Sequence, residues 1–189
     1  MSDEITTRAG FIAILGAPNV GKSTLVNRLV GAKVSIVSPK VQTTRTRVLG
    51  IFIEGESQVI LVDTPGIFEP KRRLDRAMVA AAWSGANDAD AIALLIDAKA
   101  GIDARSQAII DKLKADHRTA YVILNKIDLV AKEALLVLAE KLISTGIFTD
   151  CFMVSASTGD GVNDLTKVFA EAVQAGPWLF PEDEISDMP

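Results

Sequence analysis

Six short apolar runs recur along the chain, and longer segments in which apolar residues follow a helical spacing separate most of them. Each run is rich in Val, Ile, Leu and Ala, which is typical of parallel strands covered on both faces. The runs span residues 10–15, 47–53, 58–63, 91–97, 120–125 and 151–155. We therefore predict six strands that pair in one sheet.

Between the runs, apolar residues three or four positions apart predict helices that pack on the sheet. These stripes are Leu25 with Leu29, Val26 with Val30, Leu135 with Leu138 and Leu142, and Val162 with Leu165 and Phe169. Residues 54–57, EGES, are too few for a crossover helix and predict a hairpin turn. The predicted fold class is α/β: a three-layer α/β/α arrangement whose six-stranded sheet is mostly parallel and has one antiparallel strand. Ligands of such sheets bind beyond the carboxyl ends of the strands.

Composition narrows the class of protein. With 189 residues, of which 49% are hydrophobic and 23% charged, the chain can form one domain with a sizeable core. A formal net charge of −4 argues against strong, unaided binding of nucleic acid by this segment. No apolar run approaches the about 18 residues that span a bilayer, and the N-terminus has no apolar signal core. We therefore expect a cytoplasmic protein.

For three single residues we expect a structural role and no part in binding or catalysis. Cys151 is the only cysteine, so it cannot form an internal disulfide, and we expect it in a buried strand position in a reducing compartment. His117, the only histidine, should be an exposed connector residue. Trp178 should pack against a helix end.

Directly after the first strand, residues 16–24 read GAPNVGKST and satisfy the phosphate-loop pattern G-x-x-x-x-G-K-[ST]. In this pattern backbone N–H groups surround phosphates, the lysine reaches the β- and γ-phosphates, and the serine hydroxyl binds Mg²⁺. A glycine-rich turn with a chance lysine is the alternative, which the strand–loop–helix context disfavours. The predicted nucleotide-binding residues here are Gly16, Ala17, Pro18, Asn19, Val20, Gly21, Lys22, Ser23 and Thr24.

The third strand ends in a second motif, VDTPG, whose candidate residues are Asp63, Thr64, Pro65 and Gly66. An aspartate at the end of an apolar strand can hold Mg²⁺, usually through water. Gly66 has no side chain to block the approach of its N–H to a γ-phosphate. An ordinary Pro-Gly turn is a competitive alternative for this motif taken alone.

The fifth strand ends in NKID, which supplies Asn125, Lys126, Ile127 and Asp128. Guanine presents two donors, at N1 and N2, that one carboxylate accepts, whereas adenine has an acceptor at N1 and would leave Asp128 unpaired. Asn125 is predicted to contact the base edge and to brace the phosphate loop, and Lys126 to lay its stem over the base. A pair of helix-capping side chains is the alternative. This motif favours GTP over ATP.

After the last strand, Ser155, Ala156 and Ser157 form a third element of base recognition, with the Ala156 N–H directed at guanine O6 and the serines tightening the loop. The tripeptide is a weak signal on its own, and its weight comes from its position. Four motifs in one order, each at a strand end, predict a guanine-nucleotide site in a P-loop NTPase fold.

Two irregular segments flank the expected γ-phosphate position. Residues 42–47, QTTRTR, contain Thr43, Thr44 and Thr46, any of which could close on the metal ion. A second segment, residues 67–76, follows Gly66 and has a similar loop character. Solvated connectors are the alternative, but two such segments beside a γ-phosphate are the layout of a conformational switch.

These motifs resemble the GTPase domain of the Era family, bacterial GTPases of ribosome assembly. The resemblance rests on GAPNVGKSTLVNRLVG, QTTRTRVLGI, VDTPGI, NKID and SAS, and on the tail FPEDEISD. It implies an Era-type GTPase domain over residues 1–176 and an acidic linker over residues 177–189, toward a C-terminal K-homology RNA-binding domain that is absent from this chain. It also implies the small ribosomal subunit and its 16S rRNA as partners, and peripheral association with the inner membrane. We expect this segment itself to be monomeric.

The resemblance also assigns roles around the γ-phosphate. It selects Thr44, which directly precedes arginine, as the Mg²⁺-binding threonine beside Ser23 and Asp63. Ile67 occupies the position where many GTPases have a water-orienting glutamine, and relatives with an asparagine at the position of Asn19 use it to help bind K⁺. A cation there would stabilise the charge that develops on the phosphates. The implied catalytic set is Lys22, Asn19, Thr44 and Gly66.

The sequence thus predicts a slow Mg²⁺-dependent GTPase, with K⁺ as an activating cation, that switches between GTP-bound and GDP-bound states. Two alternatives stay open. One is a P-loop ATPase or nucleotide kinase, against which NKID argues. The other is a nucleotide-gated binding module with negligible hydrolysis, which Ile67 favours.

Overall fold

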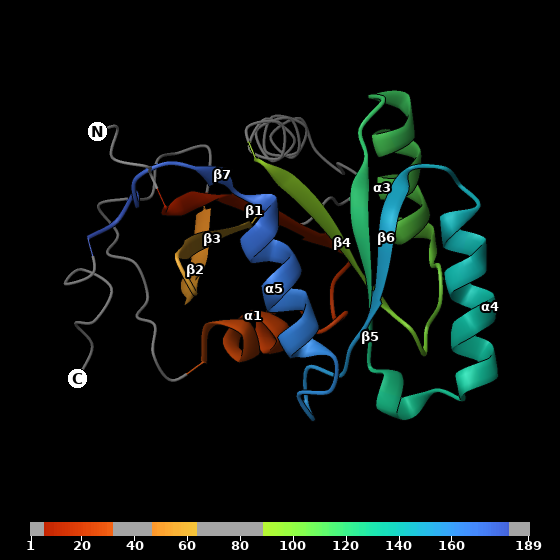
Figure 1. Cartoon of the computed structure of the whole chain (residues 1–189). Coiled ribbons are helices and arrows are strands. Elements are labelled where there is room, and N and C mark those ends of the chain that lie inside the picture. The colour runs from red at the N-terminus through yellow and green to blue at the C-terminus, as the bar shows by residue number, and fades with distance from the viewer. Residues whose placement is uncertain (1–5, 32–46, 64–88, 182–189) are drawn as a thin grey trace.

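The computed structural model describes residues 6–31, 47–63 and 89–181 (Figure 1). Strands and helices alternate over most of this length. In chain order they are β1 (Arg8–Gly16), α1 (Lys22–Val30), β2 (Arg47–Glu54), β3 (Ser57–Asp63), β4 (Ala91–Asp97), α3 (Ala104–Ala115), β5 (Ala120–Asn125), the 3₁₀ helix η3 (Ile127–Leu129), α4 (Lys132–Ile143), β6 (Phe148–Met153), α5 (Val162–Ala172) and β7 (Gln174–Ala175).

The strands form one sheet in the order β2-β3-β1-β4-β5-β6, with β7 beside β1. Strands β1, β3, β4, β5 and β6 are parallel, and β2 runs antiparallel to β3. The prediction of a mostly parallel α/β sheet is confirmed. Over the described residues the sheet has seven strands rather than the predicted six, because β7 pairs antiparallel with β1 through Arg8–Ala175 and Ala9–Gln174. A strand of two residues is too short to produce a periodic pattern in the sequence.

The predicted hairpin turn is present. Glu54 pairs with Ser57, and Gly55 and Glu56 form the turn between them. Gly55 has φ 59°, a left-handed conformation that glycine adopts without steric cost.

The last predicted strand begins three residues earlier and ends two residues earlier than expected. It was expected over 151–155 but β6 spans Phe148–Met153, and Val154 and Ser155 follow it. Thr149 and Asp150 are exposed on β6, which is an edge strand of the described sheet. Polar residues on a half-exposed strand interrupt the apolar run by which a buried strand is recognised.

Two apolar clusters fill the space on the two faces of the sheet, as predicted for a three-layer fold. On one face α3 and α4 contribute Ile109, Ile110, Leu113, Leu135 and Leu142. On the other face α1 and α5 contribute Leu25, Val26, Leu29, Val162, Leu165 and Phe169. The predicted stripe residues Leu25, Val26 and Leu29 of α1, the α5 stripe, and Leu135 and Leu142 of α4 are thus core residues, while Val30 and Leu138 are partly buried and pack against their clusters. Figure 1 shows α1 and α5 side by side on one face of the sheet.

After α5 the chain returns to the beginning of β1 and to the β2–β3 hairpin. Thr7 and Gly176 exchange hydrogen bonds, with Thr7 Oγ1 to Gly176 O at 2.7 Å and Gly176 N to Thr7 O at 3.0 Å. Trp178 Nε1 donates to Glu56 O at 3.0 Å. The indole N–H thus has a carbonyl acceptor in the hairpin turn, and the expected packing of the Trp178 ring against a helix end stays a prediction.

A buried glutamine fixes the next residues of this exit segment. The Gln58 side chain is fully buried in β3; its Oε1 accepts from Leu179 N at 2.9 Å and from Phe180 N at 3.1 Å, and its Nε2 donates to Phe180 O at 2.9 Å. The predicted linker therefore begins with residues hydrogen-bonded to the sheet. Residues 182–189 lie outside the described part of the chain.

The remaining single-residue expectations have mixed outcomes. His117 is exposed after α3, as predicted. Cys151 lies on β6 but is only partly buried, and burial followed by the nearby Asp150 carboxylate raises the pKa of its thiol. Among the described helices, none is long and apolar enough to cross a membrane.

Candidate nucleotide-binding site

The predicted motifs meet at one edge of the sheet, where the parallel strands have their carboxyl ends. The pairing register places Ile14 beside Asp63, Gly16 beside Leu95 and Asp97 beside Asn125. The loop after β1, the end of β3 and the end of β5 are therefore neighbours. This is the edge at which a doubly wound α/β sheet binds ligands.

The phosphate loop between β1 and α1 depends on residues in left-handed conformations. Asn19 has φ 65° and Gly21 has φ 93°. A Cβ on Gly21 would lie 2.3 Å from Asn125 Nδ2, so the loop packs too closely for any other residue there. Helix α1 begins at Lys22, and no described side chain caps it. Its first N–H groups thus point into the loop without intrahelical partners, at the positive end of the helix dipole, which is the arrangement that binds a phosphate.

The two side chains predicted to face the phosphates and the metal ion are in contact. Lys22 Nζ lies 2.7 Å from Asp63 Oδ1, and only 20% and 11% of the two side chains is exposed. Ser23, which follows Lys22 on the first turn of α1, is exposed. A carboxylate and a hydroxyl are oxygen ligands of the kind that Mg²⁺ prefers, so the described residues fit that ion.

Asn125 joins three loops. Its side chain, only 2% exposed, donates from Nδ2 to Val20 O at 2.9 Å, and its Oδ1 accepts from Ala156 N at 3.0 Å. The bracing of the phosphate loop expected of this residue is thus present. The Ala156 N–H was predicted to meet guanine O6, but in the structure it is paired with Asn125, so a base contact would have to share it.

Asp128, the residue on which guanine selectivity rests, is exposed and oriented by a serine. Ser155 Oγ donates to Asp128 Oδ1 at 2.9 Å. Ser155 is fully buried, lies 3.2 Å from Ser157 Oγ, and accepts from Thr158 N at 3.2 Å. One oxygen of the Asp128 carboxylate is therefore held by the serine loop, in the way that a residue reading a base edge requires.

Two side chains at this edge were missed by sequence reasoning. Asp97, the last residue of β4, lies 2.8 Å from Lys126 Nζ, and Lys126 Nζ also donates to Asn19 O at 2.9 Å. Arg28 of α1 donates to Ala156 O at 3.1 Å and to Ser157 O at 2.6 Å. The signal for Asp97 was available, because it ends an apolar strand just as Asp63 does. Arg28 gives no comparable signal, since its partners are backbone carbonyls.

Several predicted site residues lie outside the described part of the chain. They are Thr43, Thr44, Thr46, Thr64, Pro65, Gly66 and Ile67. Their assignments to Mg²⁺, the γ-phosphate and the attacking water stay predictions.

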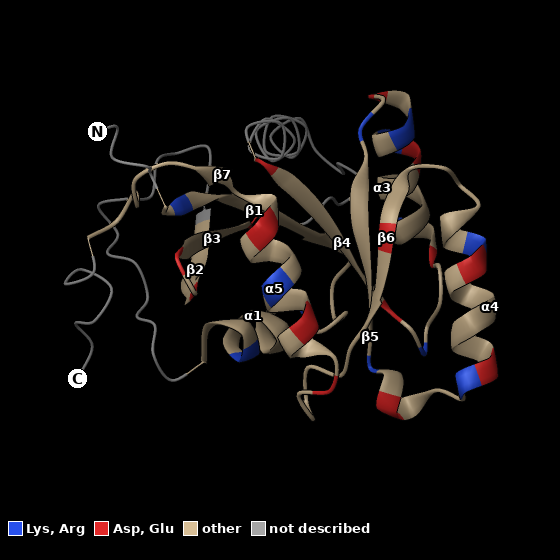
Figure 2. Cartoon of the chain, viewed as in Figure 1, with Lys and Arg blue, Asp and Glu red and all other residues tan. Residues whose placement is uncertain are grey.

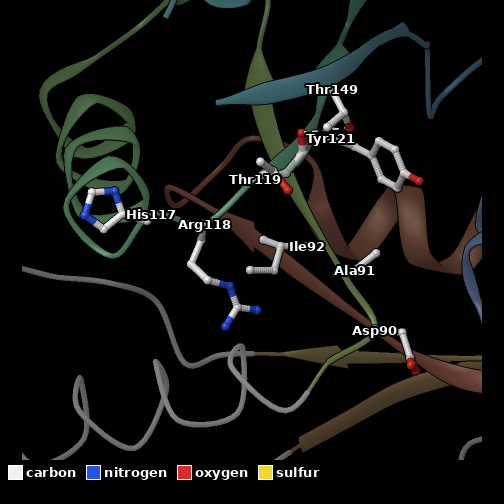
Figure 3. Close-up of a pocket in the computed structure, with 9 residues that line it drawn as sticks. Asp90, Ala91, Ile92, His117, Arg118, Thr119, Tyr121 and Thr149 are labelled. Atoms are coloured by element: carbon white, nitrogen blue, oxygen red, sulfur yellow. Dashed lines mark hydrogen bonds between the residues drawn. The ribbon is translucent and has the colours of Figure 1, made fainter. Parts of the chain in front are cut away.

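A pocket of about 340 Å³ lies away from these motifs, at the amino ends of β4, β5 and β6 (Figure 3). Asp90, His117, Arg118, Thr119 and Thr149 contribute to its polar lining. None of its described lining residues belongs to the predicted site. The pocket occupies the opposite edge of the sheet from the one where the nucleotide motifs meet.

An α/β sheet with a glycine-rich phosphate loop after its first strand, and NKID at the end of a parallel strand two positions away in the sheet, defines the class of P-loop nucleotide-binding domains. A sequence model of the family described as 50S ribosome-binding GTPase matches residues 11–126. This chain belongs to that family of GTPases.

The most similar curated proteins found include two bacterial relatives. GTPase Era of Afipia carboxidovorans is 58% identical over 183 residues, which cover 97% of this chain and 59% of that protein. GTPase Era of Caulobacter vibrioides is 53% identical over 197 residues and is covered over 62% of its length. The chain thus spans about three fifths of the length of these relatives.

Solved structures agree with the fold. The chain is 41% identical to a variant of Aquifex aeolicus Era bound to GDP and AlF₄⁻, with a TM-score of 0.78. It has the same identity, with a TM-score of 0.79, to Era in complex with MgGDPNP and nucleotides 1506–1542 of 16S ribosomal RNA. Each likeness covers 97% of this chain and 63% of the solved one.

Proposed function

We propose that this chain is a guanine-nucleotide switch that binds GTP and GDP and hydrolyses GTP to GDP and phosphate. The observation that carries the proposal is the hydrogen-bonded network around Asn125, which joins the phosphate loop to the two base-recognition motifs. One rigid assembly can therefore hold the phosphates and the base of the same ligand. Membership of a GTPase family supports this reading.

Guanine selectivity is proposed to come from Asp128, whose carboxylate would accept from N1 and N2 of the base. The direct test is a competition titration of a fluorescent GDP analogue with GTP and with ATP, in which GTP should compete and ATP should not. Asp128→Asn should shift the preference from guanine toward xanthine, because an amide N–H can donate to the carbonyl that xanthine has at C2. Unchanged GTP affinity in this variant would refute the role of Asp128.

We propose that Mg²⁺ accompanies the nucleotide, held by Ser23 and Asp63 with Thr44 as a third ligand. When bound, it would neutralise charge on the β- and γ-phosphates. Lys22 would contribute positive charge at the same phosphates, and Gly66 an N–H to the γ-phosphate. Thr44→Ala should slow hydrolysis and weaken Mg²⁺ dependence while GDP affinity is kept. An equal loss of GDP affinity would contradict the assignment.

Hydrolysis is proposed to need no glutamine, since Ile67 cannot orient water. Instead Asn19, which is exposed at the bend of the phosphate loop, would help hold a K⁺ ion that stabilises developing phosphate charge. Single-turnover phosphate release should then be faster in K⁺ than in Na⁺, and Asn19→Ala should remove the difference. Equal rates in the two salts would eliminate this part of the proposal.

The partner is proposed to be the small ribosomal subunit, engaged through 16S rRNA by a further domain rather than by this segment. A solved relative is bound to a fragment of that RNA, and it is longer than this chain. The net charge of −4 and the mixed signs along α4 and α5 (Figure 2) suit a domain that does not grip RNA by itself. We further propose that the segment is a monomer in the cytoplasm, with any attachment to the inner membrane peripheral.

Two other functions can be separated from this one by experiment. A P-loop ATPase would bind ATP in the competition titration. A binding module with negligible hydrolysis would bind GTP selectively but release no phosphate in a single turnover in K⁺. The Ser155–Asp128 contact favours guanine recognition over the first alternative.

A further inference from the structure

Asp97 is held in one conformation at the edge where the nucleotide motifs meet. Its Oδ1 accepts from Lys99 N at 2.9 Å and from Ala100 N at 3.2 Å, and its Oδ2 lies 2.8 Å from Lys126 Nζ. Burial acts to raise the pKa of Asp97, but the hydrogen bonds from Lys126, Ala100 and Lys99 outweigh it and lower that pKa. The carboxylate is therefore a fixed negative charge beside the phosphate loop.

Lys126 is the side chain that this charge holds. Its backbone has φ 65°, and its Nζ bridges Asp97 Oδ2 and Asn19 O. The far end of the lysine side chain is thus tied both to β4 and to the phosphate loop. In the proposed function this stem lies against the guanine ring, so its direction sets one wall of the base site.

We propose that Asp97 is a positioning residue for guanine-nucleotide binding, which acts by holding Lys126 extended against the base and the phosphate loop. This inference rests on the proposed function. Without the Asp97 charge, Lys126 keeps only the neutral Asn19 carbonyl as a partner, and its stem gains rotamer freedom that nucleotide binding must remove. The base wall loosens, and the bound nucleotide leaves faster.

A purely structural role is the competing explanation, because Asp97 also closes the turn at residues 98–101. Asp97→Asn separates the two roles. The asparagine oxygen can still accept from Lys99 N and Ala100 N, whereas its amide nitrogen, a donor, faces the lysine ammonium. The turn is kept and the ion pair is lost.

The experiment follows dissociation of a fluorescent N-methylanthraniloyl-GDP after excess GDP is added. D97N should accelerate dissociation on the order of tenfold, as for the loss of a partly exposed charged hydrogen bond. Asp103→Asn is the matched control, because Asp103 caps α3 through Ser106 N at 2.7 Å on the same loop. This control should leave the dissociation rate unchanged.

A double-mutant cycle identifies the route of the effect. Lys126→Met keeps the stem and removes the ammonium, so adding D97N to it should change the dissociation rate by no more than about twofold. A full additional acceleration in the K126M background, or a D97N rate equal to that of D103N, overturns the inference. If D97N melts below the assay temperature, D97E is used instead, and its smaller acceleration should likewise vanish with K126M. Failure of the unmodified chain to bind the GDP probe at all would instead defeat the proposed function.

Discussion

Replacement of Asn125 by alanine should destabilise the domain and open the nucleotide edge. The side chain is only 2% exposed, and it satisfies Val20 O at 2.9 Å and Ala156 N at 3.0 Å. Asn125→Ala leaves a buried acceptor and a buried donor without partners. Water that enters between the two loops is one way to satisfy these two groups.

The size of the effect follows from these two bonds. Each of the two unsatisfied buried groups costs roughly 1–3 kcal/mol. The variant avoids the cost of burying the Asn125 amide, which offsets part of this penalty. We therefore expect the free energy of unfolding to fall by about 2–4 kcal/mol. For a domain of this size 1 kcal/mol lowers the melting temperature by about 2–4 °C, so the expected fall is on the order of 4–16 °C. Affinity for a fluorescent GDP analogue should fall as well.

The assay is thermal unfolding followed by circular dichroism, with two further variants. Asn125→Asp keeps the acceptor for Ala156 N but sets a carboxylate oxygen against Val20 O. Its free energy of unfolding should therefore fall by at least the cost of one unsatisfied buried group. Asn163→Ala removes an exposed asparagine on α5 and is the matched control. If Asn125→Ala melts within 1 or 2 °C of Asn163→Ala, the network does not carry the stability assigned to it.

Three further predictions concern other parts of the fold. Gly161→Ala should lower the free energy of unfolding in urea more than Gly146→Ala does. Both glycines have positive φ (75° and 80°), but of the two only Gly161 would place a Cβ against a backbone oxygen, that of Met153, 2.2 Å away. Equal losses of stability in the two variants would contradict this. Gln58→Ala should release residues 179 and 180, and with them the neighbouring Trp178, so the Trp178 emission should shift to the red in a variant whose other tryptophan is phenylalanine. An unchanged spectrum would argue that the Gln58 hydrogen bonds do not hold this segment. Alkylation of Cys151 by iodoacetamide at pH 8 should be slower than that of glutathione, because burial raises the pKa of the thiol and lowers its thiolate fraction; equal rates would refute the raised pKa.

Sequence reasoning worked where one physical signal dominates. Strands buried on both faces are continuous apolar runs, so β4 and β5 begin and end at the predicted residues. The same signal failed for β6, whose exposed Thr149 and Asp150 interrupt the run. The phosphate loop and NKID could be found because their chemistry needs particular residue types at fixed spacing, and the fold then brings them to one edge.

The sequence does not show which distant residue each polar side chain contacts. Gln58 is a polar residue at the start of an apolar strand, yet nothing in its neighbours indicates that its amide bonds to residues more than a hundred positions later. Asp97 and Asp63 end similar strands, but one pairs with Lys126 and the other with Lys22. Such choices depend on the strand order, which local pattern does not determine.

The nucleotide edge is also where the backbone departs from what its local sequence prefers. Among the described residues, Asn19, His117 and Lys126 are the non-glycine residues with positive φ, and Lys126 Nζ donates to Asn19 O. Backbone conformations of this kind cost of order 1–3 kcal/mol each and persist only where surrounding contacts determine them. Asn19 and Lys126 are thus held by their mutual hydrogen bond. The Asn125 side chain supplies a second, independent hydrogen bond between the phosphate loop and the NKID loop.

Loss of that tie should therefore release local strain before it unfolds the domain. In Asn125→Ala, hydrogen exchange measured by mass spectrometry should rise first in peptides that cover residues 17–21 and 125–128. Peptides from the buried strands β1 and β4 should lose only the protection that corresponds to the fall in global stability, because their hydrogen bonds open only with the sheet. An equal loss of protection in the strands and in the two loops would mean that Asn125 acts on global stability alone and does not hold these loops locally.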